Sequence, residues 1–334
     1  DPIINAVNIT PSSGVTSSTA LTCSATATDA DGGSPSLSYA WSTAGGVSLG
    51  TGTTVTLSAT LVQPTDTVLC TVTAKDADGG EDTLSDSITV DNTPPVIDTH
   101  QITPATTIKT DTTLTCSATA TDADGETATL SYSWSNGSGT TLGTSATLAL
   151  TPTTVVPGDT ISCAVLAEDG FGGTDSSIVS VSVENSAPTV DSITIAPATG
   201  VTTRTALTCT ATASDPDGGT PTLSYEWQNK SGGILGTGAT LALTPSMVAP
   251  TESVTCLATA TDTGAATDTD STSVTVDNTA PVVSSVVISP ATGVTTNSTL
   301  TCTGTATDAD GETPTLSYEW SSGTKTLSTT NTVT

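Results

Sequence analysis

The chain alternates apolar and hydroxyl side chains with a period of two in many short stretches. In residues 21–28, LTCSATAT, the Leu, Cys and Ala side chains fall on one face and the Thr and Ser side chains on the other. Such alternation is typical of a half-buried β-strand, and no stretch shows the 3.6-residue period of a helix. In the first 93 residues the pattern predicts about seven strands, of which six are placed over residues 6–10, 21–28, 37–41, 55–61, 68–74 and 84–90.

The same pattern returns every 93 residues. The segment TCSATATDADG at Thr22 recurs at Thr115, Thr208 and Thr301 with few changes, and Trp41 recurs at the same interval. A period of this length lies within the size range of an independently folding domain and exceeds that of solenoid repeats. Short segments that contain Pro, namely VDNTPP, VENSAP and VDNTAP, separate the copies. In what we interpret as a piece of a longer protein, we expect domains over residues 1–93, 94–186 and 187–279 and a partial domain over 280–334.

Seven cysteines lie 46 or 47 residues apart along the chain. Either alternating pairing fits these intervals, but one of the two keeps every bond within a single repeat and leaves only Cys302 unpaired. Metal ligation is disfavoured because the cysteines lack the close spacing of zinc sites and the chain has one His. Disulfides persist in oxidising compartments, so an extracellular or cell-surface location is expected. The expected pairs are Cys23–Cys70, Cys116–Cys163 and Cys209–Cys256.

A Trp lies between the two cysteines of each repeat, on the same strand face as a Leu and a Tyr. The order Cys, Trp, Cys across about seven strands predicts an immunoglobulin-like β-sandwich, in which the Trp packs on a disulfide between the sheets. These aromatic side chains are nearly the only large ones available to fill a core, so a core role is favoured over stacking on sugars. The predicted fold class is therefore all-β, with tandem immunoglobulin-like sandwiches arranged as beads on a string.

The net charge of −28 restricts the partners of the chain, since five Lys and Arg residues stand against 33 Asp and Glu residues. Binding to nucleic acid or to an anionic membrane surface requires a cationic face, which this composition does not supply. No apolar run reaches the length of a membrane span, so this part of the chain is not expected to insert directly into a membrane. With a single His and no nucleophile motif, the chain is predicted to be no enzyme.

Two loops in each complete repeat concentrate acidic residues: a D-x-D pair after the first cysteine, and a second group after the second cysteine. In an immunoglobulin topology both loops emerge at the end of the sandwich where the chain enters, next to the linker. Crowded carboxylates repel one another unless a hard cation neutralises them, and Ca²⁺ accepts six to eight oxygen ligands. Calcium is therefore the expected cofactor at each junction; Asp-Gly turns and general surface acidity are the alternatives. The candidate ligands are Asp29, Asp31, Asp76, Asp82, Asp91, Asn92, Asp122, Asp124, Asp169, Asp175, Glu184, Asn185, Asp215, Asp217, Asp262, Asp268, Asp308 and Asp310.

The segments TCSATATDADG, PTLSYEWS and VDNTAP together resemble the tandem immunoglobulin-like, PKD-like and cadherin-like repeats of large bacterial and archaeal surface proteins. In cadherin-like repeats, linker Asp and Asn residues and DxD motifs hold calcium between successive domains. The resemblance implies this role for the linker pairs, and adds one pair to the candidate ligands. The linker pattern is shorter than the cadherin one, and no counterpart of the cadherin glutamates is recognised. The linker pairs are Asp91–Asn92, Glu184–Asn185 and, added here, Asp277–Asn278.

The function predicted from these features is an extracellular structural or adhesive rod of disulfide-bonded repeats with calcium-stiffened junctions. Two alternatives remain: the subunit of a self-assembling extracellular filament, and a carbohydrate-binding appendage of a secreted enzyme. The expected partners are further copies of the chain, or a protein or glycan of a cell surface or matrix.

Overall fold

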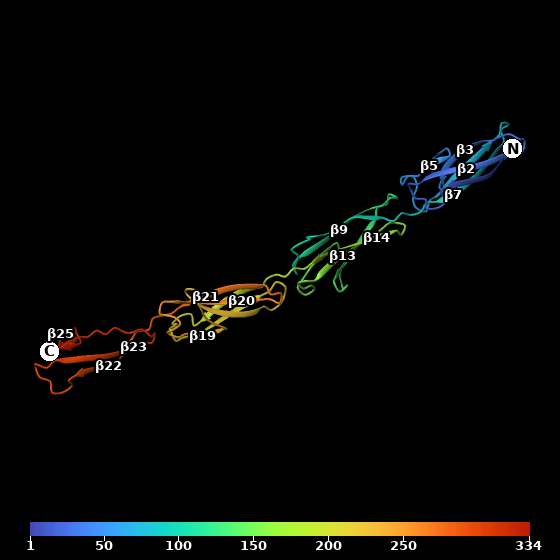
Figure 1. Cartoon of the computed structure of the whole chain (residues 1–334). Helices are drawn as coiled ribbons and strands as arrows, with labels where there is room; N and C mark the ends of the chain where they lie inside the picture. Colours follow the sequence, from blue (N-terminus) through green and yellow to red (C-terminus); the bar gives the residue numbers. More distant parts are fainter. The chain divides into compact units, whose positions relative to one another are not determined.

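The chain is built entirely of β-strands and connecting loops. The computed structural model describes residues 1–334 and contains no helix of the length and apolarity that crossing a membrane requires. It divides into two compact units, Asp1–Glu184 and Asn185–Thr334. Each repeat occupies its own stretch of the colour scale in Figure 1, so each sandwich is built from consecutive residues.

The first unit begins with a sandwich of seven strands. A three-stranded sheet of order β1-β2-β5 packs against a four-stranded sheet of order β4-β3-β6-β7, and neighbouring strands are antiparallel. The strands are β1 (Pro2–Thr10), β2 (Ala20–Asp29), β3 (Ser36–Thr43), β4 (Ser48–Thr51), β5 (Thr54–Thr56), β6 (Thr67–Lys75) and β7 (Glu81–Thr89).

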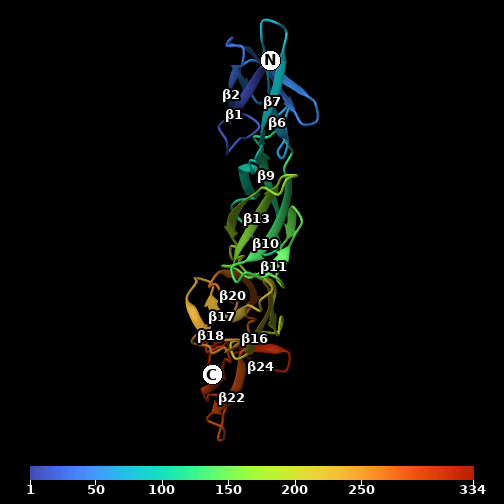
Figure 2. The ribbon, with the colours of Figure 1, turned by 90° about the vertical axis from the view of Figure 1, so that its right-hand side faces the viewer.

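The second sandwich of this unit repeats the same topology. Its sheets have the orders β12-β9-β8 and β11-β10-β13-β14, and Figure 2 shows β13, β10 and β11 of the larger sheet side by side. The strands are β8 (Val96–Thr103), β9 (Thr113–Thr121), β10 (Thr129–Asn136), β11 (Thr141–Gly143), β12 (Thr147–Ala149), β13 (Thr160–Glu168) and β14 (Thr174–Ser182).

The second unit contains the third sandwich, with sheets β15-β16-β19 and β18-β17-β20-β21, and the fourth repeat, with a sheet β22-β23-β26 and a hairpin β24-β25. The strands of the third sandwich are β15 (Thr189–Ala196), β16 (Ala206–Ser214), β17 (Thr222–Asn229), β18 (Ile234–Thr237), β19 (Thr240–Ala242), β20 (Ser253–Thr261) and β21 (Thr267–Thr275). Those of the fourth repeat are β22 (Val282–Ser289), β23 (Leu300–Thr307), β24 (Trp320–Ser322), β25 (Lys325–Ser328) and β26 (Thr332–Val333).

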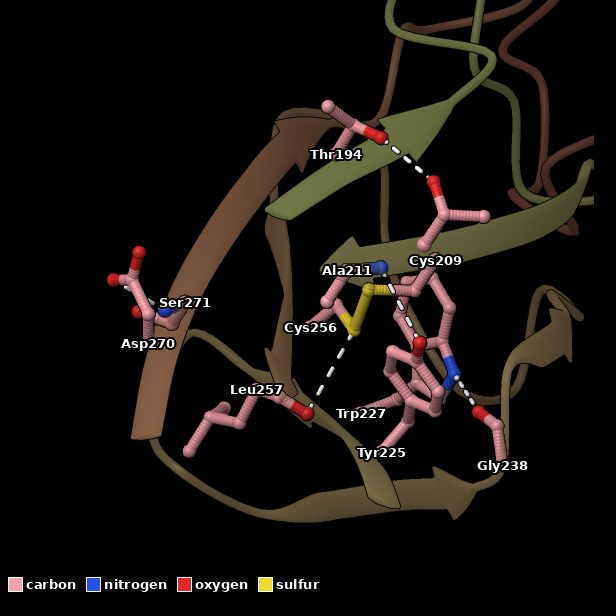
Figure 3. The surroundings of a disulfide bond; sticks show 11 residues. Thr194, Cys209, Ala211, Tyr225, Trp227, Gly238, Cys256, Leu257, Asp270 and Ser271 are labelled. Atoms are coloured by element: carbon pink, nitrogen blue, oxygen red, sulfur yellow. Dashed lines mark hydrogen bonds between the residues drawn. A yellow bond between two sulfur atoms is a disulfide. The ribbon is translucent and has the colours of Figure 1, made fainter. Parts of the chain in front are cut away.

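A disulfide between the two sheets organises the core of each complete sandwich. In the third, Cys209 on β16 is bonded to Cys256 on β20, and Trp227 on β17 lies directly opposite Cys256 (Figure 3). The indole N–H of Trp227 donates a hydrogen bond of 2.9 Å to the carbonyl oxygen of Gly238, so this large side chain is buried with its polar atom satisfied. The three expected disulfides are all present, at Cys23–Cys70, Cys116–Cys163 and Cys209–Cys256.

The immunoglobulin-like fold predicted from the sequence is confirmed. Trp41, Trp134 and Trp227 are each at most 1% exposed, so they fill the cores and offer no face for stacking on a sugar. The predicted strand over residues 55–61 is correct only at its start, because β5 ends at Thr56 and the chain then turns, with Leu61 and Val62 N–H groups donating to the carbonyl oxygen of Ser58.

The fourth repeat exposes an apolar side chain that is buried at the corresponding position of the first sandwich. Ile288 on β22 is 46% exposed, whereas Ile9, at the corresponding position of the first sandwich, is 5% exposed. Cys302 on β23 is free and partly buried. The apolar face of this sheet is the one that the strands β6 and β7 help to cover in the first sandwich.

Candidate metal centre

The entry end of the second sandwich brings together three polar segments: the linker after β7, the loop between β9 and β10, and the loop between β13 and β14. The backbone N–H of Thr93 in the linker donates a hydrogen bond of 2.6 Å to Asp124 Oδ2 in the first loop. The side-chain amide of Asn92 donates one of 2.9 Å to Asp169 Oδ2 in the second loop. The predicted convergence of linker and acidic loops is therefore present at this end.

The first Asp of each loop holds that loop in its turn. Asp122 Oδ1 accepts the N–H of Asp124 at 2.7 Å, and Asp169 Oδ1 accepts the N–H groups of Phe171 and Gly173 at 2.8 Å each. Burial alone would raise the pKa of Asp169, but these N–H groups and the Asn92 amide hold it below its ordinary value. Asp169 is consequently an ionised carboxylate at neutral pH.

Gly173 lets the linker approach the second loop. A Cβ atom built on it would lie 2.3 Å from Asp169 Oδ2, 2.6 Å from Asn92 Nδ2 and 2.9 Å from the Cα of Pro94. Any larger residue would displace the backbone of Pro94, which positions the neighbouring linker residues. The glycine therefore serves the close contact between linker and loop.

Several buried oxygen atoms at this end have no hydrogen-bond partner. They are Asn92 Oδ1, Asp122 Oδ2, both carboxylate oxygens of Glu126, and Thr93 Oγ1. Carboxylate oxygens of Asp122, Asp124 and Glu126 lie within 4.8 Å of one another. Buried polar atoms are nearly always paired, and a bound cation is one kind of partner that could satisfy such oxygens.

The electrostatics of the cluster are unfavourable in the bare protein. Burial, followed by the nearby negative charges of Asp122 and Asp124, raises the pKa of Glu126. Asp124 is only 2% exposed, so the surrounding water screens it little. A divalent cation bound among these oxygens would remove both the repulsion and the unpaired acceptors.

The same framework recurs in the second unit. In the third sandwich the N–H of Ser186 donates to Asp217 Oδ2 at 2.6 Å, and the Asn185 amide donates to Asp262 Oδ2 at 2.8 Å. That amide is the leading cause that keeps the pKa of Asp262 below its ordinary value. Asp215 Oδ1 accepts the Asp217 N–H at 2.8 Å, so the D-x-D loop also has the same turn.

In the fourth repeat, Asp308 Oδ1 accepts the N–H of Asp310 at 2.8 Å, and Asp310 Oδ2 accepts that of Thr279 at 2.6 Å. The Thr279 N–H is the main cause of the lowered pKa of Asp310. The D-x-D turn and its bond to the linker are thus kept in this repeat as well.

In the first sandwich the amino group of Asp1 lies 4.0 Å from Asp29 Oδ1 and 3.9 Å from both Asp31 Oδ2 and Asp76 Oδ2. The pKa of Asp76 is lowered, chiefly by the N–H of Gly80. The corresponding carboxylates of the two loops thus lie close together in this sandwich as well.

Other candidate ligands are used differently. The second Asp of the later loop binds the entering strand at its β-bulge: Ile4, Ile97 and Val190 N–H groups donate to Asp82, Asp175 and Asp268 at 2.7 to 2.9 Å. Asp91, Asp277 and Asn278 are exposed. Glu184 turns back to its own sandwich, where its Oε1 accepts the Thr107 N–H at 3.1 Å and its Oε2 lies 3.7 Å from Lys109 Nζ.

Glu126 was not among the residues picked from the sequence. The signal for it is the sequence DADGE, which occurs in the second and fourth repeats, where the first and third have DADGG and DPDGG. A second group of possible ligands, His100 with Cys116 and Cys163, holds no metal in this state because both sulfurs are in a disulfide.

No family model and no curated protein matches the chain. Among solved structures, immunoglobulin domains 1–5 of Sidekick-1 are 18% identical with a TM-score of 0.33, covering 83% of this chain and 59% of that one. A Ca²⁺-stabilized adhesin with which an Antarctic bacterium binds ice is 16% identical with a TM-score of 0.34, covering 92% and 83%. Cadherin domains 3–6 of protocadherin gamma B2 are 14% identical with a TM-score of 0.29, covering 85% and 75%. Similarities of this size carry no functional argument.

Proposed function

We propose that the chain is a stretch of an extracellular structural or adhesive rod whose sandwiches are joined at calcium-binding junctions. The observation that carries the proposal is the set of buried, unpaired oxygens of Asn92, Asp122 and Glu126 beside the buried carboxylate of Asp124. The three disulfides support an oxidising, extracellular setting. The partners that suit such a chain are further copies of it, or a protein or glycan of a cell surface or matrix.

Calcium fits the donor set better than other biological cations do. The donors are oxygens only, which suits a hard cation and disfavours zinc, whose structural sites use sulfur and nitrogen. Glu126 offers both oxygens, as bidentate carboxylates do for calcium, and Asn92 adds an amide oxygen. Magnesium would demand a stricter octahedral arrangement at shorter distances.

Through Asn92, binding of the ion would involve the linker as well as the second sandwich. This residue lies in the linker between β7 and β8, and the other donors lie in a loop of the second sandwich. An ion held by both would fix the linker against that sandwich and so restrict its freedom relative to the preceding one. Extracellular calcium modules commonly bind at about 10⁻⁴ to 10⁻³ M, so such junctions would be filled outside cells.

Calcium titration of the metal-free full chain by calorimetry tests the proposal, together with the thermal unfolding temperature in calcium and in excess chelator. We expect saturable binding, and a higher unfolding temperature with calcium because only the folded state holds the ion. Glu126→Gln should weaken the binding at this site about tenfold or more. Glu168→Gln, which removes the same charge from an exposed position on β13, is the matched control. Equal titrations for wild type and Glu126→Gln would contradict the proposal.

A further inference from the structure

A hydroxyl group of the first sandwich reaches into the acidic loop of the second. Ser17, in the loop between β1 and β2, is 1% exposed. Its Oγ–H donates a hydrogen bond of 2.5 Å to Asp124 Oδ1, and the same oxygen lies 3.5 Å from the carbonyl oxygen of Ala123. Short O–H···O bonds to a carboxylate are among the stronger hydrogen bonds in proteins.

The contact belongs to a closed circuit of hydrogen bonds. The carbonyl oxygen of Val15 accepts the N–H of Asp91 at 2.6 Å, at the start of the linker. Two residues later the N–H of Thr93 donates to Asp124 Oδ2, and Asp124 Oδ1 accepts from Ser17, two residues after Val15. Loop, linker and carboxylate therefore hold one another, with no metal in the circuit.

The second unit contains the same circuit between the third sandwich and the fourth repeat. Thr203, which is fully buried, donates to Asp310 Oδ1 at 2.8 Å, and Asp310 Oδ2 accepts the Thr279 N–H. The linker N–H of Asp277 donates to the carbonyl oxygen of Val201 at 2.6 Å. Here Ser is replaced by Thr, so the conserved chemical element of the two circuits is the hydroxyl group.

The two carboxylates that receive these hydroxyls are buried. Asp124 and Asp310 are 2% and 4% exposed. Burying a charge costs free energy unless hydrogen bonds compensate for it, so the donated hydroxyls offset part of that cost.

We infer that Ser17 and Thr203 are positioning residues that fix the orientation of the following sandwich by donating to the second Asp of its D-x-D loop. The bond holds the junction without metal, and it keeps Asp124 beside Asp122 and Glu126, where carboxylate oxygens of the three residues lie within 4.8 Å of one another. The second part of this inference rests on the proposed calcium binding; the first part does not.

The test uses the full chain with spin labels attached, through a chemistry that spares cysteine, at one exposed position on β7 and one on β14. Pulsed dipolar spectroscopy in excess chelator should give a narrow distance distribution for the wild type. Ser17→Ala should broaden it, and Ser17→Thr should restore it because Thr203 shows that a threonine fits this role. Ser18→Ala is the matched control, since Ser18 is exposed on the same loop.

Calcium titration of the same variants gives the second readout. Ser17→Ala should weaken calcium binding about tenfold, the equivalent of one lost hydrogen bond to a charged group, without lowering the unfolding temperature of the first sandwich. A distribution in chelator as narrow for Ser17→Ala as for the wild type would overturn the inference while leaving the calcium proposal intact. A wild type that binds no calcium would overturn the proposed function, and the distributions in chelator would still decide the positioning role.

Discussion

Glu126 is a buried carboxylate whose charge is not offset by any cationic group in the metal-free protein. Both its oxygens are buried without a well-aligned hydrogen-bond partner. Its pKa is raised, first by burial and then by the charges of Asp122 and Asp124, and its own backbone N–H offsets part of that rise. A raised pKa means that the folded state binds the proton more tightly than the unfolded state does. Without metal, the contribution of Glu126 to the free energy of unfolding therefore falls as the pH rises from the ordinary value of 4.5 through the raised value.

The substitution Glu126→Gln is predicted to act in opposite directions with and without calcium. In chelator at pH 7 it should leave the second sandwich as stable as the wild type or more so, because a buried charge is removed while the shape is kept. In calcium it should be less stable than the wild type, because the ion loses a bidentate ligand. Thermal unfolding in the two conditions measures both effects; destabilisation by the same amount in each would show that Glu126 is only a structural residue.

His100 is a second residue at which the repeat departs from its own pattern. Val7 and Ile193 stand at the corresponding positions on β1 and β15. His100 Nε2 lies 3.3 Å from Cys116 Sγ, its Nδ1 is buried without a partner, and burial lowers its pKa. The imidazole therefore carries a polar atom into a place where the other sandwiches put an aliphatic side chain.

His100→Val is predicted to stabilise the second sandwich by about 1 kcal/mol at pH 8, because an unsatisfied buried nitrogen is removed. The gain should grow as the pH falls below 6.5, since a His with a lowered native pKa loses stability for the wild type on acidification. Calorimetric unfolding at pH 5 and pH 8 measures it. Gln101→Val, on the exposed face of the same strand, should stay within about 0.5 kcal/mol of the wild type. A loss of stability in His100→Val would contradict this account.

At the scale of elements, alternation was sufficient to place most strands because each has one apolar and one hydroxyl face. The alternation predicted a strand over residues 55–61, but that strand ends at Thr56, for a physical reason. Val55, Leu57 and Leu61 continue the period of two, but the N–H of Leu57 donates to the Thr19 carbonyl oxygen and the chain then folds into a turn around Ser58. An alternating pattern records burial every second residue and contains no information on where hydrogen bonding to the neighbouring strand stops.

The location of the candidate site was predictable from the sequence, but the hydrogen bonding of its carboxylates was not. The D-x-D pairs and the linker Asn could be placed at one end of the sandwich from topology alone. The sequence could not show which carboxylates are already engaged in hydrogen bonds to backbone N–H groups. Asp175 uses both oxygens on backbone N–H groups, of Ile97 and Ser176, whereas Glu126 keeps both unpaired. Only the positions of backbone donors around each loop distinguish these cases.

The disulfide is the element with the largest predicted effect on stability. It joins β9 and β13 across a separation of 47 residues, and the chain-entropy model assigns a loop of this length about 4 kcal/mol. Replacing Cys116 and Cys163 together with Ala should lower the unfolding transition of the second sandwich accordingly. Cys302→Ser, at the free cysteine, is the control and should leave that transition unchanged. A change below about 1 kcal/mol in the double variant would show that packing around Trp134 suffices.

At the scale of the whole molecule, the charge of −28 and the scarcity of Lys and Arg leave the carboxylates with few cationic side chains to pair with. Hydrogen bonds from backbone N–H groups and hydroxyls, such as those to Asp124 and Asp310, partly take that role. They orient the carboxylates but add no positive charge. The acidic surface therefore depends on ions from the solution, either diffuse monovalent ions or cations bound at the junctions.

This dependence predicts a specific response to salt. In excess chelator, raising NaCl from about 0.02 M to 0.5 M should increase the unfolding temperature, because the shorter Debye length screens the mutual repulsion of the carboxylates. In saturating calcium the same change should have a smaller effect, because bound ions have already neutralised the buried part of the charge. Calcium affinity itself should fall as NaCl rises, since screening also weakens the attraction of the site for the ion. Parallel shifts with and without calcium would mean that the repulsion is spread over the surface, and would remove the electrostatic reason for a cation at the junctions.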